Sequence, residues 1–232
     1  MRVAFGGYEA WRTGAPAPLS IETSLPAGFD DFFRTYRYLV RPAEEYWLIV
    51  RAYHEGGAPL LPGEFARLSR EAEPQLTEFA PIYFKTRERL RAVNLDRWLG
   101  LHHMYPEFGE GWSTLRREAL CYIVTTRDLE SVGRLLSMFD IDIPVERHWT
   151  KERPGGKPAA ILEIANECER KPSEILFVDD HPEHLRDVSS TGASLFWASW
   201  GFWPDTDPEA CDGYERLGNI AELLTKPVFV ER

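Results

Sequence analysis

The sequence predicts an α/β protein in which a doubly wound parallel sheet is accompanied by a large helical region. In the second half of the chain, short apolar runs alternate with helical stretches, as they do in β-α-β units. Residues 29–100 instead carry apolar side chains near helical spacing, with few strand signals. The length of 232 residues accommodates one large domain or one domain with an insert.

The predicted sheet takes its strands from three short apolar runs. They are Leu120–Val124, Ile175–Val178 and Ser194–Ala198. The helices expected between and around them cover residues 129–139, 157–169 and 183–191. In parallel sheets of this kind, ligands bind at the carboxyl ends of the strands, so the polar residues that follow each run matter most. A Gly- and Pro-containing stretch, residues 13–26, is the best candidate for a linker.

Composition excludes several classes of function. The formal net charge is −10, which opposes binding to nucleic acid or to anionic membranes. A small phosphorylated ligand stays compatible with this charge, because one local cationic pocket is enough to bind it. We find no signal peptide and no apolar run of membrane-spanning length, and the three cysteines form no paired motif. The expectation is a cytoplasmic protein with reduced thiols, and the sequence leaves a protein partner and the oligomeric state open.

Three polar clusters follow the predicted strands or open a helix. Thr125 and Thr126 follow the first run, Lys157 follows two glycines at a helix start, and Asp179 with Asp180 follows the second run. A hydroxyl and an ammonium can hold phosphate oxygens, and a pair of carboxylates can hold Mg²⁺. Taken singly, each has a structural explanation: a strand-end threonine, a solvated lysine, or a helix-capping aspartate. Their combination in this order favours a phosphate and metal site.

These motifs resemble those of the haloacid-dehalogenase superfamily, and its phosphoglycolate-phosphatase-like branch in particular. Residues 105–127 resemble the second family motif, Gly156-Lys157-Pro158 the third, and residues 175–185 the fourth. The resemblance covers residues 103–225 well. It implies an α/β core formed by residues 1–13 and 103–232. Residues 14–102 would then be a helical cap inserted after the first strand.

The resemblance also implies roles for individual residues. Thr125 would hydrogen-bond the transferring phosphoryl group, and Lys157 would neutralise its charge. Asp179 and Asp180 would bind Mg²⁺. From their position after Thr125, Thr126 and Arg127 are candidate contacts for the substrate, a small phosphorylated molecule, and an ion-paired arginine at a helix start is the alternative for Arg127. The family usually carries another acid or an amide where His184 stands, so this sequence departs from the family pattern there.

The first family motif, which supplies the attacking aspartate, has no counterpart in this chain. Its strand should be residues 2–5, but Gly6 replaces the nucleophile and Tyr8 replaces the general acid and base. A deletion of the whole loop is the alternative alignment. Without the aspartate no phosphoaspartyl intermediate forms, and the loss of a nucleophile usually costs several orders of magnitude in rate.

Three functional hypotheses follow. The chain is an inactive or weakly active pseudoenzyme that keeps a phosphate- and Mg²⁺-binding pocket and binds a ligand or a partner. Alternatively, it is an active phosphatase that uses a non-standard nucleophile, such as Glu9 or a metal-bound water. The third hypothesis is an altered or truncated form of an active enzyme. A receiver-domain reading of the run that ends in Asp179-Asp180 is rejected, because too few residues follow it.

Overall fold

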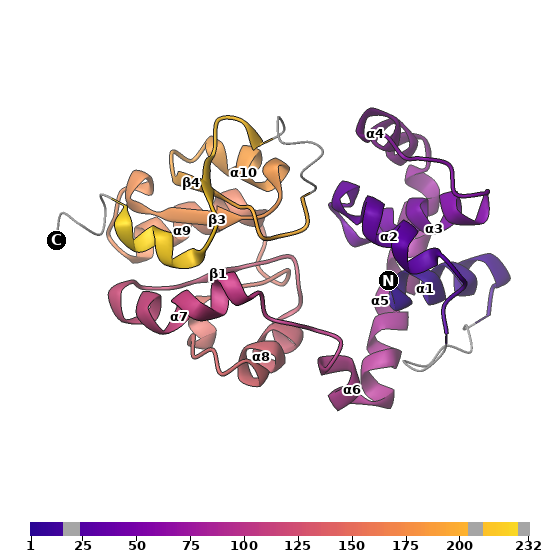
Figure 1. Ribbon diagram of the computed structural model, residues 1–232, viewed down its shortest axis with the longest axis horizontal. Coiled ribbons are helices and arrows are strands. Elements are labelled where there is room, and N and C mark those ends of the chain that lie inside the picture. Colours follow the sequence, from indigo (N-terminus) through magenta and orange to yellow (C-terminus); the bar gives the residue numbers. More distant parts are fainter. Residues whose placement is uncertain (16–23, 204–210, 227–232) are drawn as a thin grey trace. The chain divides into compact units, whose positions relative to one another are not determined.

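The computed structural model of the chain describes residues 1–15, 24–203 and 211–226 (Figure 1). They form two compact units, Met1–Leu101 and His102–Arg232. The linker predicted at residues 13–26 falls largely in residues 16–23, which lie outside the described part. No helix in the described part is long and apolar enough to cross a membrane.

The first unit is helical, as the spacing of its apolar residues predicts. Its α-helices are α1 (Arg2–Thr13), α2 (Phe29–Tyr36), α3 (Tyr46–His54), α4 (Pro62–Glu71), α5 (Glu73–Val93) and α6 (Leu95–Leu99). Short 3₁₀ turns, η1 (Arg37–Leu39) and η2 (Ala43–Glu45), separate α2 from α3. The core of the unit is strongly aromatic and is built on the fully buried rings of Phe29 and Phe79, with Phe33 and Trp47 nearly as buried.

The prediction that residues 2–5 form the first strand of the sheet is wrong. They begin helix α1, in which Ala4, Gly7 and Tyr8 are buried at helical spacing. Helix α1 packs against α5 and α3 of the first unit. Gly7 allows a close approach to α5, because a Cβ atom there would lie 3.2 Å from the Phe79 ring. Residues 2–13 therefore contribute to the helical unit and supply no strand to the sheet.

The second unit contains the α/β core. Its strands are β1 (Ile123–Val124), β2 (His148–Trp149), β3 (Leu176–Asp179), β4 (Ser194–Ala198) and β5 (Glu215–Leu217). Its helices are α7 (Pro106–Glu118), α8 (Leu129–Met138), α9 (Gly156–Glu167) and α10 (Pro182–Ser189), with 3₁₀ turns η3 (Val145–Arg147), η4 (Pro172–Glu174) and η6 (Ile220–Thr225). All three predicted strands and the helices between them are present in this unit.

Every strand pair in the second unit is parallel. Strand β1 pairs with β2, and β4 lies between β3 and β5 in a second ladder. Alternate residues of β3 enter different clusters: Leu176 and Val178 pack with Trp112 and Ile220, whereas Phe177 packs with Leu185. Because successive strand residues point to opposite faces, α7 and η6 cover one face and α9 and α10 cover the other. The unit is therefore a three-layer α/β sandwich.

Candidate functional site

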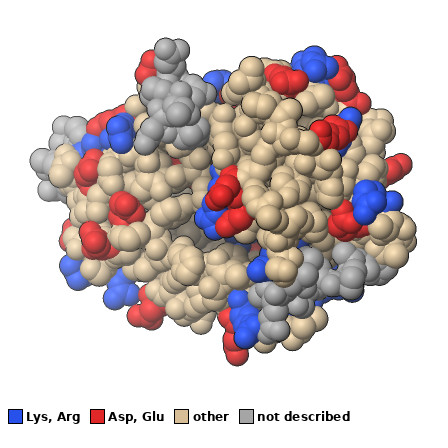
Figure 2. All heavy atoms as spheres, turned by 45° about the vertical axis from the view of Figure 1, so that its right-hand side comes forward, with Lys and Arg blue, Asp and Glu red and all other residues tan. Residues whose placement is uncertain are grey.

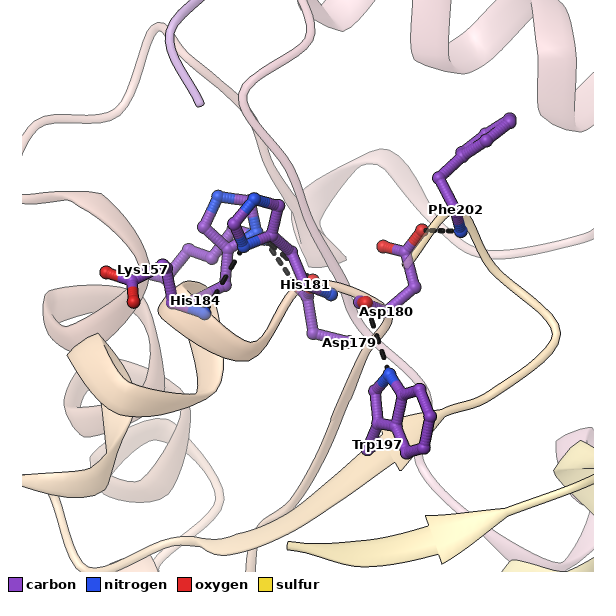
Figure 3. A network of polar contacts seen from close by, with 8 residues as sticks. Lys157, Asp179, Asp180, His181, His184, Trp197 and Phe202 are labelled. Atoms are coloured by element: carbon purple, nitrogen blue, oxygen red, sulfur yellow. Dashed lines mark hydrogen bonds and ion pairs between the residues drawn. The ribbon is translucent and has the colours of Figure 1, made fainter. Parts of the chain in front are cut away.

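The carboxyl end of β3 brings together Lys157, Asp179 and His184 (Figure 3). Asp179 is the last residue of β3, and His184 lies on the first turns of α10, which follows directly. Lys157 is the second residue of α9, after Gly155 and Gly156 with φ angles of 91° and 68°. Glycine is the residue that adopts such angles without strain, so the pair lets the chain turn sharply into α9.

The Asp179 carboxylate accepts hydrogen bonds at both of its oxygens. Lys157 Nζ donates to Oδ2. Oδ1 accepts from the His181 backbone amide at 2.9 Å and lies 3.1 Å from His184 Nδ1. Burial acts to raise the pKa of Asp179, but the hydrogen bond from His184 and the charge of Lys157 outweigh it and hold this pKa well below its usual range. Asp179 is therefore an anion fixed by its neighbours.

The Lys157 ammonium is shielded from solvent, with its side chain 14% exposed. Besides Asp179, it contacts His184 Nδ1 at 3.1 Å, and it lies over the face of the Phe177 ring. An ammonium has three N–H donors, and Asp179 accepts one of them. The donors that Asp179 leaves free give Lys157 the capacity to bind an oxygen of an anionic ligand.

His184 is the member of this network that sequence reasoning did not assign to the site. It stands where the resembling family usually has an acid or an amide. The available signal was its position five residues after Asp179, in the first turn of a helix that begins with proline. Because helical side chains tilt toward the N-terminus of their helix, His184, the third residue of α10, reaches back toward the end of β3.

Asp180 belongs to the same turn but is held by different partners. Its Oδ2 accepts a hydrogen bond of 3.0 Å from the Phe202 amide, and its carbonyl accepts one from Trp197 Nε1 (Figure 3). Gly201 packs so closely that a Cβ atom there would lie 2.1 Å from the Asp180 Cβ. The loop after β4 therefore requires a glycine in order to close over Asp180 and fix its orientation.

The threonines and Arg127 follow β1, as predicted. The Thr125 amide donates to the Trp149 carbonyl and extends the β1–β2 ladder, and the Thr125 hydroxyl accepts a hydrogen bond from the Arg127 amide at 3.2 Å. Thr126 and Arg127 are exposed, and the Arg127 guanidinium lies 3.3 Å from His102 Nε2. The structure thus places these residues at a strand end of the unit that holds Lys157, and their contact with a ligand remains a prediction.

The carboxylates as they lie do not fit a Mg²⁺ ion. Magnesium requires near-octahedral oxygen ligands. The described residues contain no group of three or more His, Cys, Asp or Glu side chains that could hold a metal. The Lys157 ammonium lies against Asp179 where a metal would have to approach, and Asp180 is directed at the Phe202 amide. In this arrangement Lys157 is the cation that balances Asp179.

The positions aligned with the missing nucleophile lie on α1 in the first unit. Gly6 and Tyr8 are buried there, and Tyr8 stacks on His54. Glu9 pairs with Arg12 at 2.7 Å and with His54 at 3.2 Å. The substitute nucleophile that the sequence offered is therefore engaged by two partners within the helical unit.

Comparison with known proteins places this fold. No protein-family model and no curated protein matches the sequence. A crystal structure from Bacteroides fragilis, described as a haloacid dehalogenase-like hydrolase, matches with a TM-score of 0.56 at 15% sequence identity. The match covers 96% of this chain and 91% of that chain. The chain therefore has the haloacid-dehalogenase-like fold, as its motifs indicated.

Proposed function

We propose that this protein binds a small phosphorylated molecule, or inorganic phosphate, at Lys157 and does not transfer the phosphoryl group through an aspartyl intermediate. The observation that carries the proposal is the shielded Lys157 ammonium at the start of α9, held in place by Asp179 and His184. Backbone N–H groups at a helix N-terminus favour anions, and they add to the charge of the ammonium. The fold of the chain agrees with a phosphorylated ligand.

Two observations support binding without turnover. A nucleophilic carboxylate needs an oxygen that can reach phosphorus, yet both oxygens of Asp179 accept hydrogen bonds and Asp180 is bonded to the Phe202 amide. Residues 2–5, which should have carried the attacking acid, belong to α1. We therefore expect no turnover at ordinary enzyme rates.

The surface charge limits the size of the ligand. In the view of Figure 2, acidic and basic side chains are interspersed, and neither sign forms a continuous patch. With a net charge of −10, the chain offers a polyanion no extended basic surface in this view. A small anion that needs one or two cationic contacts suits such a protein better than a nucleic acid.

Calorimetric titration with inorganic phosphate, at ionic strength matched with chloride, tests the binding. Phosphate should bind the parent chain, and Lys157→Met should weaken the affinity by about tenfold or more, since a charge-assisted hydrogen bond contributes about 1.5–3 kcal/mol. Lys85→Met removes the same charge from an exposed position on α5 and serves as the control. Equal affinity of all three proteins would rule out Lys157 as the anion contact.

Turnover of an aryl phosphate in the presence of MgCl₂ tests the second part of the proposal. We expect the parent chain and Asp180→Ala to be equally inactive. Turnover at enzyme rates that Asp180→Ala abolishes would show that the protein is a working hydrolase, and the search for its nucleophile would then begin with Glu9.

A further inference from the structure

Asp179 Oδ2 keeps one acceptor position beside the Lys157 ammonium. A carboxylate offers about four lone-pair positions, two at each oxygen. Both positions at Oδ1 are used, because the His181 amide donates at 2.9 Å and His184 Nδ1 lies 3.1 Å away. Among the described residues, Lys157 is the one group that donates to Oδ2. One lone pair of Oδ2 therefore stays open to a donor from outside this network.

Donors of Lys157 lie next to this lone pair. An ionised carboxylate only accepts hydrogen bonds, so His184 must donate to Asp179 through a protonated Nδ1. That nitrogen then cannot accept from Lys157, although the two nitrogen atoms are 3.1 Å apart. With respect to the described residues, the ammonium therefore keeps two of its three donors. A ligand at this point must offer an acceptor to Lys157 and a donor to Asp179.

The shielding of the ion pair makes the open position at Oδ2 important for binding. Both side chains are mostly covered, so little water reaches them. Their charges cancel, and an arriving ligand therefore meets a neutral pair rather than an isolated cation. At low local dielectric, the repulsion between an anionic ligand oxygen and Oδ2 is weakly screened. A ligand oxygen that faces Oδ2 must therefore carry a proton, because otherwise two negatively charged oxygens would be forced together.

We propose that Asp179 makes the anion site selective for oxyanions that keep a proton, such as hydrogen phosphate, over fully ionised ones such as sulfate. Neighbouring oxygens of one phosphate group make the two contacts: one accepts from Lys157, and the next donates its O–H to Asp179 Oδ2. A site that pairs with a ligand O–H rejects analogues that lack it, because its own polar group is then left unpaired. This inference rests on the proposed function and adds the residue that determines which oxyanion binds.

Calorimetric titration of the whole chain with phosphate and with sulfate tests the proposal. At about pH 8 both anions are tetrahedral dianions, and they differ in one proton. The parent chain should bind phosphate at least about tenfold more tightly than sulfate. In Asp179→Asn the amide can donate as well as accept, so this preference should fall below about threefold. Glu163→Gln removes the same charge from an exposed position on α9 and should keep the preference of the parent chain.

Three results would overturn the inference, and they separate it from the proposed function. Equal affinity of the parent chain for the two anions would refute the selectivity and leave phosphate binding at Lys157 intact. A preference for phosphate that survives in Asp179→Asn would assign the selectivity to another group. Binding of neither anion would refute the proposed function, and this inference with it. If Asp179→Asn fails to fold, Asp179→Glu replaces it, because the longer side chain displaces the acceptor and should likewise weaken the preference.

Discussion

Both units carry exposed ion pairs, and the α/β unit adds a shielded one at its candidate site. In the helical unit, arginine and carboxylate partners stand four residues apart on exposed helix faces, as in Arg51–Glu55 and Arg67–Glu71. In the α/β unit, Lys157 and Asp179 are joined across a strand end, with side chains 14% and 10% exposed. Exposed pairs contribute little to stability, whereas removing one partner of a buried pair is expensive. The number of ion pairs therefore says less about a unit than the solvent around each of them.

The hydrophobic cores of the two units also differ. The helical unit is stabilised by aromatic side chains packed between helices, and the α/β unit by apolar layers on both faces of its strands. The predictions below follow from these differences and run from the largest expected effect to the smallest.

Truncating the central aromatic residue of the helical unit should have the largest effect. Phe79 is fully buried on α5, so Phe79→Ala should destabilise the unit by about 4 kcal/mol through lost burial and the cavity left behind. Val93→Ala, on the same helix but 74% exposed, should change stability by less than about 0.5 kcal/mol. Urea unfolding followed by hydrogen exchange of each unit measures both. Similar costs for the two variants would contradict the assigned core.

Breaking the buried ion pair comes next. Lys157→Met should cost about 3 kcal/mol, because it leaves Asp179 charged and shielded with only part of its support. Adding Asp179→Leu should recover much of this loss, since two apolar residues can replace a buried pair. If the double variant is less stable than Lys157→Met, the two residues do not act as a pair.

A third test places a methyl group in the close contact between Gly201 and Asp180. Gly201→Ala should destabilise the α/β unit by about 2 kcal/mol, because the new methyl group would overlap the Asp180 side chain. Gly133→Ala is the matched control. Gly133 lies on α8 with open space around it, so alanine there should stabilise by about 0.8 kcal/mol. Thermal unfolding of both variants should therefore shift in opposite directions.

The depressed pKa of Asp179 predicts how stability depends on pH. The folded-state pKa lies below the ordinary value, so its contribution is present above about pH 4 and is lost as the pH falls further. Asp179→Asn cannot titrate, so its stability should fall less steeply than that of the parent chain between about pH 5 and pH 2. Parallel acid limbs in urea titrations would show that Asp179 is not the responsible group.

The smallest effect is expected at the surface of the helical unit. Arg67→Met breaks the Arg67–Glu71 pair, in which both side chains are about half-exposed. The change in the free energy of unfolding should stay below about 0.5 kcal/mol and should vanish at high salt. A loss comparable to that of Lys157→Met would remove the contrast between the two units.

The sequence predicted three of the five strands described in the α/β unit, because β1, β3 and β4 lie in short apolar runs followed by a turn, whereas β2 (His148–Trp149) and β5 (Glu215–Leu217) do not. Runs such as Ile175–Val178 indicate a strand, and the polar residue after each run lies at the carboxyl end of that strand, where a ligand is expected to bind. The polar residues at the carboxyl ends of the strands were predicted for the same reason. Their hydrogen-bond partners were not predicted. The hydrogen bond from the Phe202 amide to Asp180, for example, depends on the path of a loop, which no local sequence pattern encodes.

The error at the amino terminus has a different cause. Residues 2–5 were assigned to a strand by alignment with the resembling family, although Ala4, Tyr8 and Trp11 have the spacing of a helix face. In the structure Ala4 and Tyr8 are buried and Trp11 packs against the same core. Periodicity over the first twelve residues would have indicated the helix, whereas the three-residue apolar run Val3–Phe5 fits either state.

The position of Lys157 shows a conflict between a helix and its site. A cation on the first turn of a helix opposes the positive end of the macrodipole, so α9 taken alone would be more stable with almost any neutral or acidic residue there. Locally unfavourable choices of this kind are a form of frustration, and in natural proteins they concentrate at sites that selection maintains for another purpose. Asp179 relieves the frustration in the folded chain, and an arriving anion would relieve it as well, so occupancy of the site should tighten the start of α9.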